Sequence, residues 1–264
     1  MSNSVLATPS FYSSHHKTLD MLKSSRGRAV GIIDPFKIDT QTVVDKAKFA
    51  QDNGEPWVIL ASTDKPNHKM VIDSALRHIK RETRLPIILH FSATPGEGFP
   101  IASEADGVIW PALLGSSSPY HVWHSYLDTA YTIGCQSNKN ARYPDPILTA
   151  ALTVGTDNRT GRLLGTVPLI ETNSEIDYYA RIISTMNFDM LYLYSRNEFV
   201  SPETCRRFRE LLPDDCLIFV SGNMDCSEKV VTYLSAGADY VGFSSAWECA
   251  EWKYRALDMF RTQS

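Results

Sequence analysis

Residues 217–245, LIFVSGNMDCSEKVVTYLSAGADYVGFSS, carry the clearest evidence for the fold. It begins and ends with short apolar runs of strand-forming residues, and a segment of helical periodicity lies between them. Asp225 and Glu228 have the spacing of a capping box at the start of this helix, and Gly237 stands where the helix should end. A strand, a helix and a second strand in this order predict two parallel strands joined by a crossover helix.

The same alternation of strand and helix continues outward over most of the chain. Start and stop signals separate the apolar runs, for example Thr40 before one helix with Gly54 after it, and Ser201-Pro202 before another. Eight runs are predicted to be strands, at residues 29–33, 57–61, 87–90, 107–110, 147–153, 190–193, 217–220 and 240–243.

The length of the chain agrees with one barrel. A (β/α)8 barrel needs about 250 residues as a single unit, and the chain has 264. No linker, low-complexity tract or internal repeat divides it. The sequence therefore predicts an α/β protein, a (β/α)8 TIM barrel with a single domain over residues 1–264, in which residues 1–27 form a helical lead-in.

The composition excludes several classes of protein. With 43% hydrophobic and 21% charged residues, the chain is typical of a globular protein with a large core. A formal net charge of -4 without a long Lys/Arg run argues against nucleic acid as a partner. No stretch approaches the roughly 18 apolar residues of a transmembrane segment, and no signal peptide is recognised, so we expect a cytoplasmic protein. The five cysteines are widely spread and suggest neither disulfides nor a zinc site.

Function is expected at the carboxyl ends of the strands, where barrel enzymes build their sites. Ser221, Gly222 and Asn223 follow the seventh run, and Ser244 and Ser245 follow the eighth. Backbone N–H groups left free beside such small residues form the phosphate-binding site common in this fold. The alternative is that the glycine and the serines only make tight turns.

A carboxylate and a lysine follow the first run. Asp34 suits a divalent cation, and the ammonium of Lys37 suits a diphosphate. Ser62 after the second run would add a hydroxyl ligand, and Lys65 a second cation. The alternative is that Asp34 makes a turn and that Asp64 caps a helix.

Aromatic and cationic residues follow the sixth run. Tyr192 and Tyr194 occupy alternate positions of a strand and are expected to face the barrel mouth together. Arg196, just beyond them, can clamp a carboxylate or a phosphate. His121 and His124 are one helical turn apart, but no third ligand is evident, so we interpret them as helix surface.

Two longer segments interrupt the alternation after strands. Residues 111–126 are apolar and aromatic, and residues 154–168 form a polar loop that could close over a ligand. The aromatic segment is either barrel core or a groove for a long hydrocarbon chain, and periodicity does not separate the two. The residues concerned are Trp110, Leu113, Leu114, Tyr120 and Trp123.

From about residue 28 to residue 248, these motifs resemble the geranylgeranylglyceryl phosphate synthase family, which includes the bacterial PcrB heptaprenylglyceryl phosphate synthases. The matching segments are Ile33-Asp34-Pro35-Phe36-Lys37, Ala105-Asp106-Gly107, Leu113-Leu114-Gly115-Ser116, Pro119-Tyr120 and Gly237-Ala238-Asp239. Members of the family are barrels that alkylate a hydroxyl of glycerol 1-phosphate with an allylic isoprenyl diphosphate. The resemblance implies a prenyltransferase that depends on Mg2+.

The resemblance also implies roles for the polar residues. Asp34 and Ser62 would bind Mg2+, and Lys37 would balance the charge of the diphosphate. The expected substrate-binding residues are Ser62, Tyr120, Tyr192, Arg196, Ser221, Gly222, Asn223, Ser244 and Ser245. The acceptor of the hydroxyl proton stays open between the diphosphate itself and Tyr194, because an ordinary phenol is a weak candidate. A homodimer, and a peripheral membrane contact for release of the product, are further expectations.

Departures from the family pattern change the expected acceptor. The family has a glutamate that accepts hydrogen bonds from the glycerol hydroxyls where this chain has Tyr194, and Arg196 is new. Both changes suit an acceptor with a carboxylate. The favoured function is transfer of a farnesyl group to the 2-hydroxyl of 3-phosphoglycerate, as in moenomycin-type antibiotic biosynthesis. The alternatives are a glycerol 1-phosphate prenyltransferase, a phosphosugar isomerase or aldolase, and a non-catalytic prenyl-lipid-binding barrel.

Overall fold

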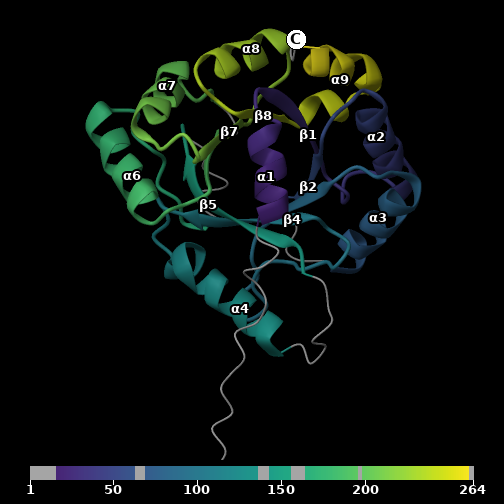
Figure 1. Cartoon of the computed structure of the whole chain (residues 1–264), viewed down its shortest axis with the longest axis horizontal. Coiled ribbons are helices and arrows are strands. Elements are labelled where there is room, and N and C mark those ends of the chain that lie inside the picture. Colours follow the sequence, from purple (N-terminus) through teal and green to yellow (C-terminus); the bar gives the residue numbers. More distant parts are fainter. Residues whose placement is uncertain (1–15, 63–68, 136–142, 156–163, 196–197, 262–264) are drawn as a thin grey trace, which may run out of the picture.

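Eight parallel strands close into a barrel in chain order, with β8 paired to β1 (Figure 1). The computed structural model describes residues 16–62, 69–135, 143–155, 164–195 and 198–261. The strands are β1 (Arg28–Ile33), β2 (Val58–Ser62), β3 (Ile87–Phe91), β4 (Gly107–Leu113), β5 (Asp145–Thr153), β6 (Met190–Tyr194), β7 (Leu217–Ser221) and β8 (Tyr240–Phe243). The predicted (β/α)8 barrel is confirmed. The largest difference is at β4, which continues to Leu113 instead of ending at residue 110.

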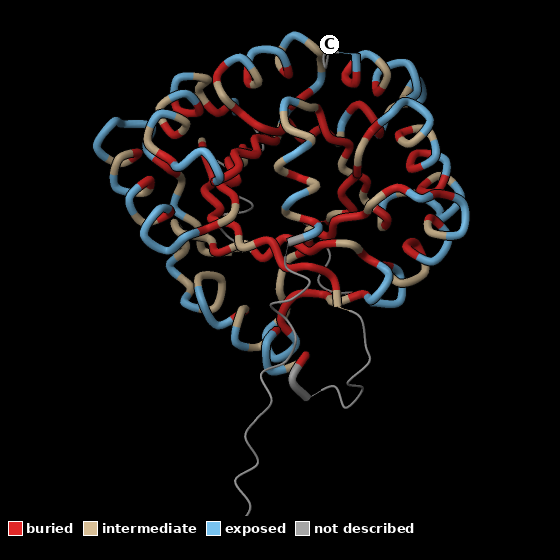
Figure 2. The backbone as a smooth tube through the Cα atoms, in the orientation of Figure 1, coloured by how far each residue is buried: buried red, intermediate tan, exposed pale blue. Residues whose placement is uncertain are grey.

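Helices surround the barrel (Figure 1). They are α2 (Thr40–Asp52), α3 (Lys69–Glu82), α4 (Ser125–Cys135), α6 (Asn173–Thr185), α7 (Pro202–Leu211), α8 (Ser227–Ser235) and α9 (Trp252–Phe260), with the short helical turns η2 (Tyr120–His124) and η3 (Ser245–Trp247). Residues between the helices and the strands form the larger apolar core, and inward-facing strand residues form a smaller one together with Leu22 and Trp57. Figure 2 shows that buried positions follow the strands and the sides of the helices that face them. None of the described helices is long and apolar enough to cross a membrane.

Local sequence signals explain where helices begin and end. Ser201 caps α7, because its hydroxyl accepts a hydrogen bond from a backbone N–H two residues later, as predicted. Gly237 follows the end of α8 with a φ of 96°, also as predicted. The predicted capping box at α8 is wrong. The helix begins at Ser227, and Asp225 forms an ion pair of 2.6 Å with Lys229 instead.

The connection between β3 and β4, residues 92–106, contains no helix, although every residue of it is described. It packs against α4. The backbone N–H of Gly96 donates to the carboxylate of Asp128 at 2.7 Å, and that of Phe99 donates to the hydroxyl of Thr129 at 2.8 Å. These hydrogen bonds fix Phe99 between α4 and the mouth of the barrel.

Helix α1 (His16–Ser24) covers the amino-terminal end of the barrel and lies at the centre of the view in Figure 1. Leu22 is fully buried there, and its carbonyl accepts a hydrogen bond from the Tyr240 hydroxyl at the start of β8. The backbone N–H of Thr18 donates to Asp145, the first residue of β5, at 3.1 Å. The described part of the predicted lead-in is therefore helical, and it closes the end opposite the expected site.

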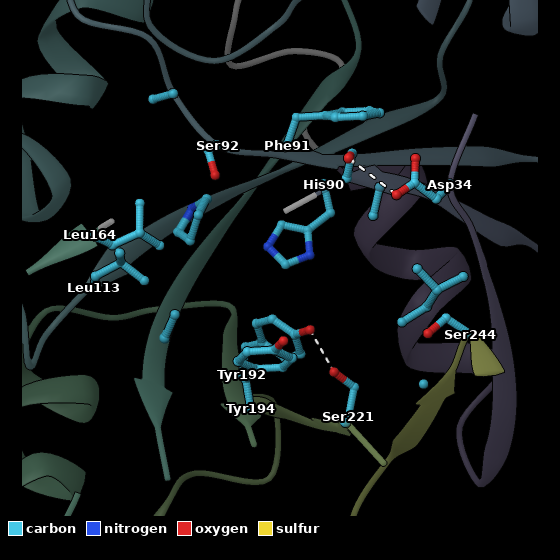
Figure 3. Close-up of a pocket in the computed structure, with 18 of the residues that line it drawn as sticks. Asp34, His90, Phe91, Ser92, Leu113, Leu164, Tyr192, Tyr194, Ser221 and Ser244 are labelled. Atoms are coloured by element: carbon cyan, nitrogen blue, oxygen red, sulfur yellow. Dashed lines mark hydrogen bonds between the residues drawn. The ribbon is translucent and has the colours of Figure 1, made fainter. Parts of the chain in front are cut away.

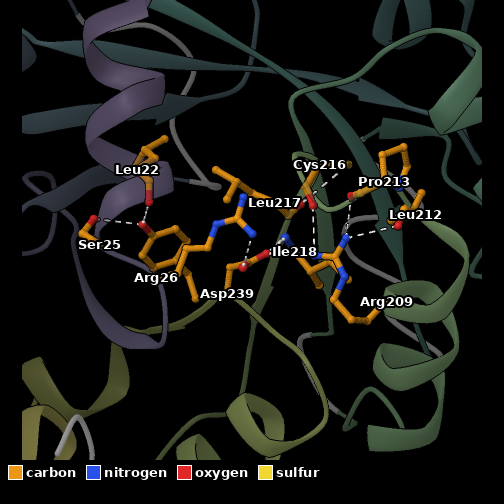
Figure 4. Close-up of polar contacts among 11 residues, drawn as sticks. Leu22, Ser25, Arg26, Arg209, Leu212, Pro213, Cys216, Leu217, Ile218 and Asp239 are labelled. Atoms are coloured by element: carbon orange, nitrogen blue, oxygen red, sulfur yellow. Dashed lines mark hydrogen bonds and ion pairs between the residues drawn. The ribbon is translucent and has the colours of Figure 1, made fainter.

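Three aspartates stand directly before strands at this amino-terminal end, and each accepts a hydrogen bond from a backbone N–H of the preceding strand. The pairs are Asp106 with Ile87, Asp189 with Leu148 and Asp239 with Ile218, at 2.8, 2.9 and 2.7 Å. Asp239 also forms ion pairs with Arg26 and Arg209, at 3.4 and 3.2 Å (Figure 4). Two of the sequence motifs that carry the resemblance, those with Asp106 and Asp239, therefore join strands.

Candidate active site

A cavity of about 450 Å³ opens at the carboxyl ends of the strands (Figure 3). This is the end of the barrel at which the sequence predicted a site. The predicted site residues that line it are Asp34, Lys37, Ser62, Tyr192, Tyr194, Ser221, Gly222, Asn223, Ser244 and Ser245. Closure of the barrel thus brings together residues from β1, β2, β6, β7 and β8 and from the loops that follow these strands.

The Asp34 site consists of Asp34, Lys37, Ser62 and Glu248. Ser62 Oγ donates to Asp34 Oδ2 at 3.2 Å, and the backbone N–H of Phe36 donates to Oδ1 at 2.9 Å. Burial raises the pKa of Asp34, and these two hydrogen bonds oppose the rise. A cation next to the carboxylate would offset the cost of burying its charge.

Asp34 and Ser62 fit a magnesium ion that is shared with the phosphates of a ligand. Mg2+ commonly keeps several waters and is held by one or two carboxylates together with substrate phosphates. No group of three or more His, Cys, Asp or Glu side chains suited to a metal occurs in the described part of the chain. One carboxylate and one hydroxyl could hold such an ion together with the phosphates of a ligand.

Lys37 and Glu248 face each other at the edge of the cavity. Lys37 Nζ lies 2.8 Å from Glu248 Oε1, and both side chains are partly exposed. Because the lysine is long and reaches solvent, an anion with more charge than one carboxylate can compete for it. Glu248 was not predicted from sequence, since 211 residues separate it from Lys37.

The small-residue site consists of Ser221, Gly222, Asn223, Ser244 and Ser245, at the ends of the neighbouring strands β7 and β8. The hydroxyl groups of Ser221 and Tyr192 are 2.6 Å apart and share a hydrogen bond (Figure 3). Ser245 Oγ donates to the carbonyl of Met224 at 2.9 Å. The site offers backbone N–H groups and hydroxyls without a carboxylate of its own, which suits an anion such as phosphate.

Gly222 is required by the backbone around it. Its φ is 103°, and a Cβ at this position would lie 1.6 Å from the carbonyl oxygen of Ser195. A side chain there would therefore collide with the β6 loop, before it could affect a phosphate in the cavity. The glycine is explained by chain packing, and its role in binding stays a prediction.

Tyr192, Tyr194 and His90 form the floor of the cavity. The two tyrosine rings both line it, with centroids 6.1 Å apart, so the prediction that they face the same way is confirmed. The edge of the His90 ring meets the Tyr192 ring at 4.9 Å between centroids (Figure 3). Burial raises the pKa of Tyr192, so its phenol stays protonated at neutral pH.

The apolar arm of the cavity consists of Phe91, Phe99, Pro111, Leu113 and Leu164. Phe99 is closed in from behind by Trp110 and Tyr126, at ring-centroid distances of 6.0 and 5.9 Å. Tyr126 also donates to the backbone carbonyl of Trp110 at 2.6 Å. These three rings make a rigid wall at the end of the arm.

The aromatic segment after β4 divides between core and cavity. Leu113 lines the cavity, Trp110 is buried behind it, and Trp123 is 46% exposed on the outer side of η2. Tyr120 is not among the residues that line the cavity, so its predicted contact with substrate is not supported by its position. His121 lines the cavity, whereas His124 is exposed as predicted.

Several residues of interest lie outside the described residues or were missed. Arg196, Asp64 and Lys65 are outside them, as are residues 156–163 of the predicted loop. Sequence reasoning missed Phe99, Glu248 and His90. Strand alternation could have found His90, because it lies two positions after the inward-facing Ile88 of β3.

Comparisons with known proteins agree with the fold. No family model matches the chain. The geranylgeranylglyceryl phosphate synthase of Thermococcus gammatolerans is 25% identical over 83% of both chains, and that of Caldivirga maquilingensis is 23% identical over 80% of this chain and 76% of its own. The crystal structure of (S)-3-O-geranylgeranylglyceryl phosphate synthase from Thermoplasma acidophilum, in complex with sn-glycerol-1-phosphate, has a TM-score of 0.78. It is 21% identical and covers 92% of this chain and 96% of its own.

Proposed function

We propose that the chain is a member of the geranylgeranylglyceryl phosphate synthase family, to which it is similar in sequence and fold, and that it transfers the isoprenyl group of an allylic diphosphate to a hydroxyl of a phosphorylated three-carbon acceptor. The observation that carries this proposal is that the Asp34 site, the small-residue site and the apolar arm share one cavity. Such a reaction needs a place for an anionic diphosphate, a place for a second phosphate, and a place for a hydrocarbon chain.

The diphosphate of the donor would bind at the Asp34 site. Asp34 and Ser62 would hold a magnesium ion, which draws electron density into the departing diphosphate when it is bound. Lys37 would exchange its ion pair with Glu248 for one with the diphosphate, which carries more negative charge. The raised pKa of Asp34 supports this arrangement, because a nearby cation stabilises a buried carboxylate.

The isoprenyl chain would lie in the apolar arm. Phe91, Phe99 and Leu113 would cover it and keep water from the allylic carbon while positive charge develops there. The acceptor would bind through its phosphate at the small-residue site. Its hydroxyl would then be held near that carbon, so that positioning supplies part of the rate acceleration.

Glycerol 1-phosphate is the acceptor that the relatives favour. The matched proteins are named for a geranylgeranylglyceryl phosphate product, and the solved structure holds sn-glycerol-1-phosphate. The 3-phosphoglycerate acceptor, the farnesyl donor and a role in moenomycin-type biosynthesis, which the sequence favoured, have no support from these relatives.

One observation keeps 3-phosphoglycerate as a second candidate. Tyr194 lines the cavity where the family pattern has a glutamate, so the floor lacks the acidic group expected to bind glycerol hydroxyls. A floor without that charge would also repel a carboxylate less. The isomerase or aldolase alternative is weaker, because Lys37, its candidate lysine, is held by Glu248 at the rim.

Product analysis by mass spectrometry tests the function and the acceptor together. The purified protein is incubated with Mg2+ and each of the C10, C15, C20 and C25 isoprenyl diphosphates, with glycerol 1-phosphate or 3-phosphoglycerate as acceptor. We expect an isoprenyl ether from at least one pair, with glycerol 1-phosphate preferred. Absence of an ether from every pair would contradict the proposed function, and ether formed only from the acid would select the second candidate.

Tyr194→Glu sharpens the choice of acceptor. The new carboxylate restores a hydrogen-bond acceptor for glycerol hydroxyls and adds a like charge against an acid. We expect kcat/KM for glycerol 1-phosphate to rise relative to that for 3-phosphoglycerate by about tenfold or more. Tyr194→Phe is the matched control and should leave this ratio near the wild-type value. An unchanged ratio in Tyr194→Glu would mean that residue 194 does not face the acceptor.

A further inference from the structure

His90 is a cavity residue to which neither the Asp34 site nor the small-residue site gives a role. It lies near the end of β3 and lines the cavity, and its ring reaches Tyr192 on β6. Since β3 and β6 are three strands apart around the barrel, this contact crosses the barrel interior. The imidazole is therefore at the middle of the floor and not at the rim.

The position of His90 is between the two phosphate sites. On one side, β3 pairs with β2, and His90 is in register with Ala61, the neighbour of Ser62. On the other side, Tyr192 links the His90 ring to Ser221 through the shared hydroxyl hydrogen bond. Figure 3 shows the ring between Asp34 and the Tyr192–Ser221 pair. A donor held at one site and an acceptor held at the other would meet over this ring.

The ring of His90 is also chemically available. Among the residues that the structure describes, neither ring nitrogen has a hydrogen-bond partner, and the ring makes an edge-to-face contact with Tyr192. Burial lowers the pKa of His90 to about 4, so the imidazole is neutral at physiological pH and keeps one nitrogen as an acceptor.

We propose that His90 is the catalytic base of the prenyl transfer and takes the proton from the acceptor hydroxyl as the ether forms. This inference rests on the proposed function. The hydroxyl oxygen forms a bond to the allylic carbon, the bond from that carbon to the diphosphate oxygen breaks, and its electron pair leaves with the diphosphate. The hydroxyl proton moves to the free nitrogen of His90, and the resulting imidazolium passes it to the diphosphate or to water when the products leave.

The chemistry of the step suits a weak base. As the new bond forms, the hydroxyl oxygen becomes positively charged and its proton becomes strongly acidic, so a modest base is sufficient. The bound diphosphate also places negative charge near the ring, and this raises the basicity of an imidazole. Tyr192 is a poor alternative, because burial raises the pKa of its phenol and its hydroxyl is engaged with Ser221.

Two substitutions separate a base from a packing residue. His90→Phe keeps a flat ring against Tyr192 but has no nitrogen, and His90→Gln keeps polarity without the ring. If His90 is the base, both should lower kcat by about 100-fold or more, while KM for each substrate changes less than threefold. The share of diphosphate substrate lost as free isoprenol should rise, because water then competes for the allylic cation. His124→Phe, at the exposed end of η2, is the matched control and should behave as wild type.

Three outcomes decide the matter, with thermal melting used to verify that each variant is folded. Low kcat in both variants, with a larger isoprenol share, supports the base, as does partial rescue by added imidazole of a third variant, His90→Ala, which leaves space for the imidazole. Wild-type kcat in His90→Phe, with a lower kcat only in His90→Gln, would show that the ring serves to pack against Tyr192. This result would overturn the role of His90 as a base but not the proposed prenyl transfer. A wild-type protein that forms no ether from any substrate pair would overturn the proposed function, and the role of His90 with it.

Discussion

The two ends of the barrel use aspartate in opposite ways. At the amino-terminal end, Asp106, Asp189 and Asp239 come directly before strands and bind backbone N–H groups of the neighbouring strand. At the carboxyl end, Asp34 follows a strand and faces the cavity. In this chain, an aspartate directly before a strand therefore bridges strands, whereas the aspartate directly after β1 lines the cavity.

The two ends also differ in how the charge is compensated. Asp239 is held by Arg26 and Arg209, so its burial is matched by protein cations. Asp34 has hydrogen bonds from Ser62 and from the Phe36 backbone, but no ion pair within the described residues. Protein side chains compensate the charge of Asp239, whereas under the proposed function a bound cation would compensate that of Asp34.

The largest effect is expected from Asp34→Asn. A neutral amide cannot compensate a divalent ion, so kcat/KM for the isoprenyl diphosphate should fall about 1000-fold, equivalent to about 4 kcal/mol of transition-state stabilisation. Stability should change by less than about 1 kcal/mol, because the substitution removes a partly buried charge that forms no ion pair with the described residues. Steady-state kinetics at limiting Mg2+ and urea unfolding measure the two quantities. Near-wild-type turnover would show that Asp34 takes no part in the reaction.

The second-largest effect is expected from Asp239→Ala, which should lower stability and leave activity unchanged. The substitution leaves Arg26 and Arg209 without this partner and removes the acceptor for the Ile218 N–H, so the free energy of unfolding should fall by about 3 kcal/mol. For the molecules that remain folded, KM for both substrates should stay within twofold of wild type. Urea unfolding with activity assays in the folded range measures this. A loss of activity without a loss of stability would contradict the division between the two ends.

The smallest effect is expected at the rim, from Glu248→Gln. Exposed ion pairs contribute little to stability, so unfolding should change by less than about 0.5 kcal/mol. Release of Lys37 and loss of a negative charge should lower the Kd for inorganic diphosphate with Mg2+ about fivefold, equivalent to about 1 kcal/mol. Asp106→Asn, which weakens the Lys80 ion pair at the other end, should leave this Kd unchanged. Weaker diphosphate binding in Glu248→Gln would instead make the carboxylate part of the binding site.

Much of the site could be predicted because parallel strands end on one side of the barrel. Asp34, Ser62, Tyr192 and Ser221 were selected as polar residues at strand ends, and all of them line the cavity. The family motifs gave a less reliable guide to function, because Asp106 and Asp239 belong to them and join strands at the opposite end. A motif records which residues recur together, and this alone does not say which end of the barrel they face.

Local sequence patterns were sufficient to predict the eight strands, their parallel order and the end of the barrel that carries the polar residues. These follow from hydrophobic periodicity and from caps, which act over a few neighbouring residues. Only the tertiary structure decided the long-range contacts. It placed Glu248 against Lys37, the carbonyl of Ser195 against Gly222, and the ring of His90 against Tyr192. Such contacts depend on closure of the whole barrel, because residues far apart in the chain meet only after every strand has found its neighbour.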